Sequence, residues 1–124
     1  MKFLFILLLF LSSCDTLPLP AQEEYSDLEI AEAIWQAEGG VKATYPYGIR
    51  SVLCEGLAEC RKICLNTVRN NRKRYIVYGY KQYPDFLSFL ASRYAPTKNC
   101  ENDLRGLNNN WLKNVRYFLT KGAK

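Results

Sequence analysis

The sequence contains no histidine among its 124 residues, and its five cysteines include no Cys-x-x-Cys pair. Structural zinc sites use Cys and His ligands at short spacings, so we expect no metal site and no cofactor. Long apolar runs are also missing, because the longest, from Phe3 to Leu11, falls well short of the roughly 20 residues that a membrane-spanning helix needs. No internal repeat or low-complexity segment follows it, so the chain fits one small domain.

The apolar run at the N-terminus has the features of an export signal. Lys2 precedes it, and the small residues Ser12 and Ser13 follow it. The alternative is a buried N-terminal helix or strand. We expect residues 1–13 to be a signal peptide and residues 14–25, which contain two prolines, to be a tether.

The stretch Leu11-Ser12-Ser13-Cys14 resembles the lipobox of bacterial lipoproteins. The resemblance implies lipidation of Cys14 and attachment to a membrane of the bacterial cell envelope, facing the periplasm or the exterior. One acyl chain anchors a protein only marginally, whereas two or more hold it firmly. Ordinary secretion, without lipidation, is the alternative.

Four cysteines remain after Cys14, and an even number in a small exported domain predicts disulfides. Three pairings are possible. A bridge between Cys60 and Cys64 is disfavoured, since the two lie four residues apart on an expected helix and disulfide geometry is specific. We favour Cys54–Cys60 together with Cys64–Cys100.

The chain carries 17 basic and 12 acidic residues, for a formal charge of +5. Export argues against nucleic acid as a partner, which leaves anionic lipid and peptidoglycan as candidates. The basic cluster of Arg69, Arg72, Lys73 and Arg74 fits either a solvated helix face or an envelope-binding surface.

Hydrophobic spacing predicts an all-α domain over residues 26–124. The first helix begins at the capping box Ser26-Asp27-Leu28-Glu29 and ends at Gly39-Gly40. Three further helices are expected: from about Leu57 to Tyr75, from Pro84-Asp85 to a stop before Pro96, and from near Asn109 or Asn110. Within the loop 41–56, Val52 and Leu53 are expected to form a short strand or buried chain. A core this thin would benefit from disulfides.

Glu38 is the most interesting polar residue of this pattern. It stands at the C-terminal end of a helix, where the macrodipole is negative, and near the apolar stripe, so we expect its pKa to be raised. A carboxyl group that stays protonated near neutral pH can act as a general acid on a glycosidic oxygen. Gly39-Gly40 leaves room for a sugar, while Tyr45 and Tyr47 fit either glycan contact or core packing.

The same stretch resembles the lysozyme-like superfamily, which includes lytic transglycosylases and phage-type muramidases. In that family a helix ends in the catalytic Glu, and a Gly-[Leu/Ile] turn follows about ten residues later, as Gly48-Ile49-Arg50-Ser51 follows Glu38 here. Asp85-Phe86 and Arg93-Tyr94-Ala95-Pro96 resemble later elements of small members. The resemblance covers about residues 28–119 and implies cleavage of the glycan strand of peptidoglycan.

The resemblance implies Glu38 as the catalytic residue. It also implies a substrate-binding set, which consists of Tyr45, Tyr47, Gly48, Ile49, Ser51 and Tyr94. The chain departs from classical lytic transglycosylases, which have Glu-Ser at the catalytic position and Gly-Leu-Met-Gln at the turn. For Tyr94, packing in the core is the alternative role.

Hydrolysis of a glycosidic bond normally needs a second carboxylate across the sugar, and no acidic residue stands out as that partner. A lytic transglycosylase needs one acid/base only, because the sugar's own 6-hydroxyl attacks. The sequence therefore slightly favours transglycosylation over muramidase action. We expect the protein to act as a monomer. The alternative is a non-catalytic lipoprotein of the same fold that binds the cell wall or a wall enzyme.

Overall fold

The computed structural model describes residues 25–50, 52–97 and 107–122. In these ranges the regular elements are all helical, with short 3₁₀ turns between the main helices. The four α-helices are α1 (Asp27–Ala37), α2 (Gly56–Val77), α3 (Phe86–Tyr94) and α4 (Trp111–Gly122). This architecture confirms the predicted small, disulfide-stabilised, all-α domain.

Several predictions concern residues outside the described ranges. These are the signal peptide and tether, the lipidation of Cys14, and the roles of Ser51 and Cys100. Within the described part of the chain, none of the helices combines the length and the apolar character that crossing a membrane requires.

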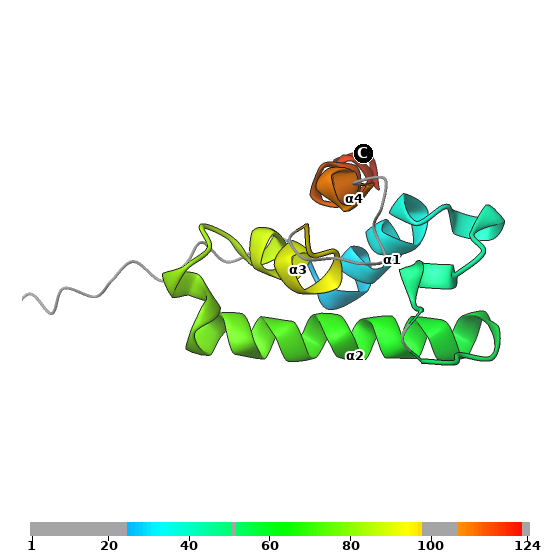
Figure 1. The fold of residues 1–124 in the computed structure, drawn as a ribbon, viewed down its shortest axis with the longest axis horizontal. Coiled ribbons are helices and arrows are strands. Elements are labelled where there is room, and N and C mark those ends of the chain that lie inside the picture. The colour runs from blue at the N-terminus through cyan, green and yellow to red at the C-terminus, as the bar shows by residue number, and fades with distance from the viewer. Residues whose placement is uncertain (1–24, 51, 98–106, 123–124) are drawn as a thin grey trace, which may run out of the picture.

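Helix α2 is the longest element and forms one side of the domain (Figure 1). Helices α1 and α3 pack against it, and α4, seen nearly end-on in this view, packs against α1 on the side away from α2. All four helices contribute to the core. Its most deeply buried large aliphatic and aromatic side chains are Ile30, Ile34, Val68, Phe86, Leu90 and Val115.

The predicted cap at the start of α1 is confirmed. Ser26 Oγ accepts a hydrogen bond from the amide of Glu29 at 3.1 Å, and the Glu29 carboxylate accepts one from the amide of Ser26 at 2.7 Å. The helix ends at Glu38, its C-cap, because Gly39 adopts a left-handed conformation with φ of 109°. A residue without a β-carbon takes this conformation easily, so the position of Glu38 follows from the Gly-Gly break.

The loop before α2 combines one confirmed and one wrong prediction. Cys54 and Cys60 form the expected disulfide, which ties the loop to the first turns of α2. Val52 and Leu53, however, belong to no strand and are exposed. Two apolar residues with no partner strand are too few to keep this segment in the core.

The second expected bridge, Cys64–Cys100, requires a correction. In the structure Cys64 is a free thiol, and it is completely buried on α2. Its sulfur lies 3.7 Å from the Tyr94 hydroxyl, so it is used in packing against α3. Cysteine is a small, mostly apolar side chain that commonly takes this role.

Candidate active site

The Glu38 side chain points from the end of α1 towards the start of α4. Its carboxyl group is half-buried, and Oε1 accepts a hydrogen bond from Trp111 Nε1 at 3.0 Å. The backbone of Glu38 is fixed as well, because its amide donates to the carbonyl of Ile34 at 2.9 Å. The packing of α4 on α1 therefore brings an indole donor to a carboxyl group 73 positions away in the sequence.

Gly48 lies against the same carboxyl group on another side. A β-carbon at this position would lie 2.6 Å from Glu38 Cδ and 2.7 and 2.8 Å from its two oxygens. The turn η2 (Pro46–Gly48) places it there, with Tyr47 at φ of 60° and Gly48 at φ of 68°. Both the conformation and the space require glycine at position 48.

Tyr94, at the end of α3, contacts both groups that surround the Glu38 carboxyl group, the η2 turn and Trp111. Its hydroxyl group donates a hydrogen bond to the carbonyl oxygen of Tyr47, which holds the turn in place. Its ring stacks on Trp111, with the ring centroids 5.2 Å apart and the planes 25° from parallel. Burial, the largest cause, raises the pKa of Tyr94, so the hydroxyl stays protonated and remains a donor.

Glu38 and the predicted turn line one cavity of about 700 Å³. Other parts of its wall come from α2, from the end of α3 and from the start of α4. Among the described residues that line it, Glu38 is the sole carboxylate. The remaining lining residues are Ala37, Gly39, Gly48, Ile49, Arg50, Ile63, Thr67, Arg93, Tyr94, Ala95, Pro96, Asn108, Asn110, Trp111 and Asn114.

The pKa of Glu38 is raised above its ordinary value, as the sequence suggested. Burial is the largest cause, because it penalises the charged form; the hydrogen bond from Trp111 and the positive charge of Arg50 act in the opposite direction. The result is a carboxyl group that holds its proton more tightly while remaining accessible from a cavity. Such a group can give a proton to a bound oxygen and take one back.

The structure separates the predicted substrate-binding residues into two groups. Gly48, Ile49 and Tyr94 line the cavity together with Glu38. Tyr47 is buried in the core, which corrects the expectation that its ring forms a wall for the substrate. Tyr45 is exposed and is absent from the described lining, and its ring lies under the Arg50 guanidinium at 5.0 Å. Tyr45 is thus linked to the cavity through Arg50, which lines it.

The predicted site did not include Trp111, an apolar residue at the start of α4. Asn108 and Asn110, for which the sequence leaves helix capping and substrate contact both open, line the cavity as well. Asn108 in addition donates to the carbonyl oxygen of Pro96 at 2.8 Å. No local signal marks these residues, because their role depends on how α4 packs against α1.

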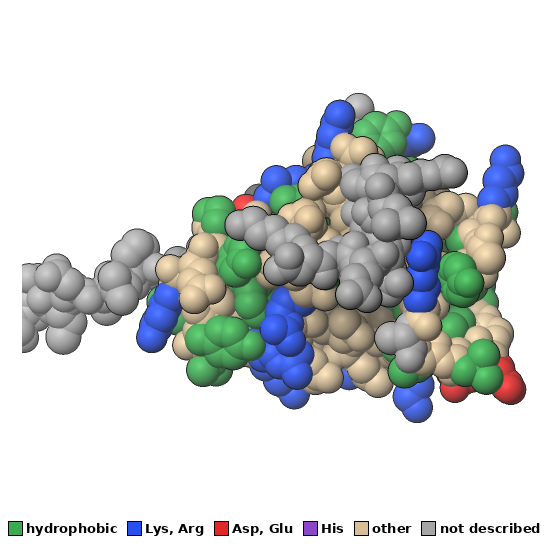
Figure 2. Space-filling view, viewed as in Figure 1, with side chains coloured by type: hydrophobic (Ala, Val, Ile, Leu, Met, Phe, Trp, Pro, Cys, Tyr) green, Lys and Arg blue, Asp and Glu red, His purple; other side chains and the backbone are tan. Residues whose placement is uncertain are grey.

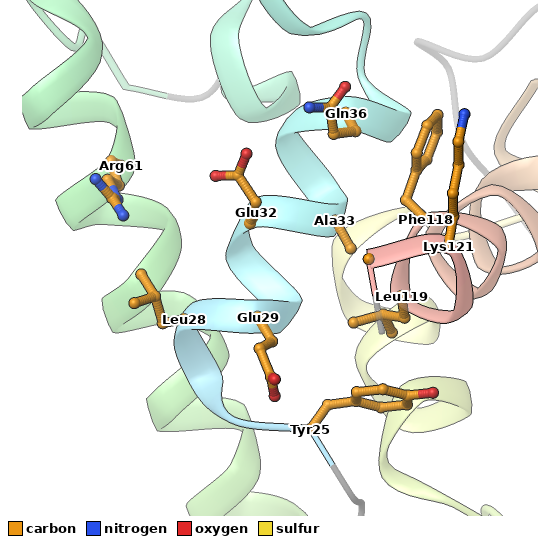
Figure 3. Close-up of a pocket in the computed structure, with 11 residues that line it drawn as sticks. Tyr25, Leu28, Glu29, Glu32, Ala33, Gln36, Arg61, Phe118, Leu119 and Lys121 are labelled. Carbon is orange, nitrogen blue, oxygen red and sulfur yellow. The ribbon is translucent and has the colours of Figure 1, made fainter. Parts of the chain in front are cut away.

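A second cavity, of about 670 Å³, lies over α1 between α2 and α4. Figure 3 shows Arg61 of α2 on one side of it and Phe118 and Lys121 of α4 on the other. Its two acidic residues, Glu29 and Glu32, are both exposed, and Glu29 is occupied by the cap of α1. This cavity therefore offers no desolvated acid, and the Glu38 cavity is the better candidate.

Within the described ranges, no group of three or more His, Cys, Asp or Glu side chains is placed to hold a metal ion. Comparison of the chain with models of known protein families, with curated proteins and with solved structures finds no match. A function for this chain is accordingly inferred from the geometry of the Glu38 cavity.

Proposed function

We propose that this protein is a lysozyme-like enzyme of the bacterial cell envelope that cleaves the glycan strand of peptidoglycan, with Glu38 as its acid/base. One observation carries the proposal. A half-buried carboxyl group with a raised pKa is held between an indole N–H and a glycine, at the wall of a cavity large enough for sugar rings.

The proposed reaction is that of a lytic transglycosylase. Protonated Glu38 donates its proton to the glycosidic oxygen, and the bond between that oxygen and the anomeric carbon breaks. The 6-hydroxyl group of the same sugar then attacks the anomeric carbon, and its proton passes to the Glu38 carboxylate. A 1,6-anhydro ring forms, no water is consumed, and Glu38 returns to its protonated state.

The composition of the cavity wall supports this reaction over hydrolysis. A hydrolase of the usual type places a second carboxylate about 5–9.5 Å from the acid. The described lining holds one carboxylate, and its other charged groups are the guanidinium groups of Arg50 and Arg93. Glu101 and Asp103 lie outside the described residues.

The alternative proposal is a non-catalytic lipoprotein that binds the cell wall or a wall enzyme. Exposed Arg50 and Arg93, together with the amide side chains of Asn110 and Asn114, would bind a glycan bearing acidic stem peptides without any proton transfer.

Zymography on murein separates the two proposals. The wild-type protein should clear the gel, Glu38→Gln should not, and Glu32→Gln, an exposed position on the same helix, should clear it as the wild type does. Mass spectrometry of the products should then show anhydro ends; reducing ends would instead indicate hydrolysis. If neither the wild type nor the variants clear the gel but all pull down murein, the binding alternative holds and the acid role of Glu38 is wrong.

A further inference from the structure

The C-terminal end of α2 presents apolar side chains to solvent. Ile76 is 65% exposed, Val77 is 71% exposed and Tyr78, just after the helix, is 46% exposed. Exposed Lys73, Arg74 and Lys81 flank them. Figure 2 shows hydrophobic and Lys or Arg side chains side by side over this end of α2, on the left of the view. We call these six residues the α2-end surface.

The charged residues in this part of the sequence have one sign. Between Glu59 and Asp85 the sequence contains seven Lys or Arg residues and no acidic residue. Two of them face Asp27, with Arg72 at 2.7 Å and Arg69 at 3.9 Å. Lys73, Arg74 and Lys81 form no ion pair within the described residues, so their charges are available to an anionic partner.

Helical geometry makes basic and apolar residues of this surface neighbours. Lys73 and Val77 are four residues apart and are therefore neighbours on the helix surface. Both face away from the buried side of α2, which carries Val68 and Tyr75. A helix face that combines apolar side chains with Lys and Arg is typical of segments that lie on a lipid surface.

The N-terminal part of the chain joins the domain at the same end. Arg72 Nη2 donates to the carbonyl oxygen of Tyr25 at 3.0 Å, and Arg72 lies one helical turn from Ile76. Cys14, the expected lipidation site, precedes Tyr25 by 11 positions. Any membrane attachment through that part of the chain therefore enters the domain beside the α2-end surface.

We propose that the α2-end surface docks on an anionic lipid bilayer. The apolar side chains enter the headgroup region, and the three cations pair with lipid phosphates. The proposal does not depend on the chemistry of Glu38. Thr67, which lines the Glu38 cavity, precedes Val77 by ten residues, or about 15 Å along the helix. The α2-end surface and the Glu38 cavity therefore occupy different parts of α2, and docking would not use the residues that line the cavity.

Vesicle co-sedimentation of the full chain tests this proposal, with Cys14→Ser present throughout so that no acyl chain contributes. Vesicles of phosphatidylcholine alone are compared with vesicles containing one part in three of phosphatidylglycerol. Each variant is compared with the parent as a ratio of dissociation constants. Any contribution of the apolar N-terminal run is common to all of them and divides out of that ratio. Because each cation near an anionic surface strengthens binding about fivefold, Lys73→Gln/Arg74→Gln/Lys81→Gln should weaken binding to the anionic vesicles on the order of 100-fold.

A second variant, Ile76→Ser/Val77→Ser, should weaken binding about tenfold or more while leaving the charge unchanged. Two matched controls should bind as the parent does. Lys42→Gln/Lys113→Gln/Lys121→Gln removes the same charge elsewhere, and Val41→Ser/Leu53→Ser removes exposed apolar groups elsewhere.

Equal loss in the test and control variants would mean that net charge alone drives binding, and the proposal would be wrong. It would also be wrong if the α2-end variants bound vesicles normally but changed the oligomeric state in sedimentation velocity, since the surface would then join two copies of the chain. Circular dichroism checks that each variant is folded, as expected for exposed positions.

Discussion

The backbone of Gly48 packs directly against the carboxyl group of Glu38. Because Gly48 has no side chain, the Glu38 carboxyl group fits between the η2 turn and Trp111. Ten residues separate the two in sequence, and the turn that brings them together has two consecutive residues with positive φ.

Replacing Gly48 by alanine should therefore disable the site. The new β-carbon would displace the Glu38 carboxyl group, and a displacement of about 1 Å costs roughly 100-fold in rate. Gly56→Ala is a matched control, because Gly56 also has positive φ, at 83°, but has nothing within 4 Å of the added carbon. Both variants should lose about 1–2 kcal/mol of stability from backbone strain. Murein cleavage should fall only in Gly48→Ala, and equal cleavage by the two variants would contradict this geometry.

The pKa of Glu38 should respond to its two polar neighbours separately. Trp111→Phe removes a hydrogen bond and Arg50→Gln removes a positive charge, so each should raise the pKa of Glu38 further, Trp111→Phe by more. Added salt should abolish the difference between Arg50→Gln and the wild type but not the effect of Trp111→Phe. Carbon-13 NMR titration of the side-chain carboxyl measures both.

Arg93→Gln is the control for this titration. Arg93 lines the same cavity but is not a cause of the pKa shift of Glu38. If Arg93→Gln moved the pKa of Glu38 as much as Arg50→Gln does, the shift would reflect the total positive charge of the cavity wall, and Arg50 would have no specific effect.

Stability should fall with rising pH because of Glu38. Its folded-state pKa lies above the ordinary value of 4.5, so the folded protein binds this proton more tightly than the unfolded chain does. The resulting stabilisation is fully present below pH 4.5 and is lost as the pH rises through the folded-state pKa. Glu38→Gln cannot lose a proton there, so it should be more stable than the wild type at neutral pH.

Urea unfolding of the wild type and Glu38→Gln across pH 3 to 8 measures this difference. The two curves should converge at the acidic end, where Glu38 is protonated in both states and resembles glutamine in shape. A Glu38→Gln variant less stable than the wild type at neutral pH would show that the charged form is favoured in the folded protein, against the burial of this group.

The Cys54–Cys60 bridge should contribute about 2 kcal/mol, the value that the chain-entropy model gives for so short a loop. Cys54→Ala/Cys60→Ala should lose that much in urea unfolding, and reductant should lower the wild type to the same level. Reductant should then have no effect on the double variant, since Cys64 is a free thiol. A remaining effect would reveal a bridge among Cys14, Cys64 and Cys100.

The sequence was sufficient to predict the helices because their signals are local. Ser26 with Glu29 marks the start of α1, the glycine pair marks its end, and Asp85 caps α3 by accepting from the amide of Ser88 at 2.7 Å. The proximity of Gly48 to Glu38 could also be predicted from the sequence, since both positions belong to one short segment.

The rest of the site depends on tertiary packing, which no spacing rule describes. Trp111 looks like any apolar residue of an amphipathic helix until α4 is placed on α1. The sequence leaves open whether the ring of Tyr47 packs in the core or contacts the substrate, and it is buried because the turn η2 packs against α1 and α2. For Cys64, sequence counting favoured a bridge, while the helix register placed the thiol in the core.

The order of these elements along the chain has a consequence for synthesis. Glu38 lies in the first helix, but the indole that binds it comes from the last one. A ribosome makes the chain from its N-terminus, so Glu38 emerges long before Trp111 does. Until α4 docks, the carboxyl group lacks the hydrogen bond from Trp111. The complete Glu38 site, and with it the proposed activity, therefore forms only after the last helix has been made.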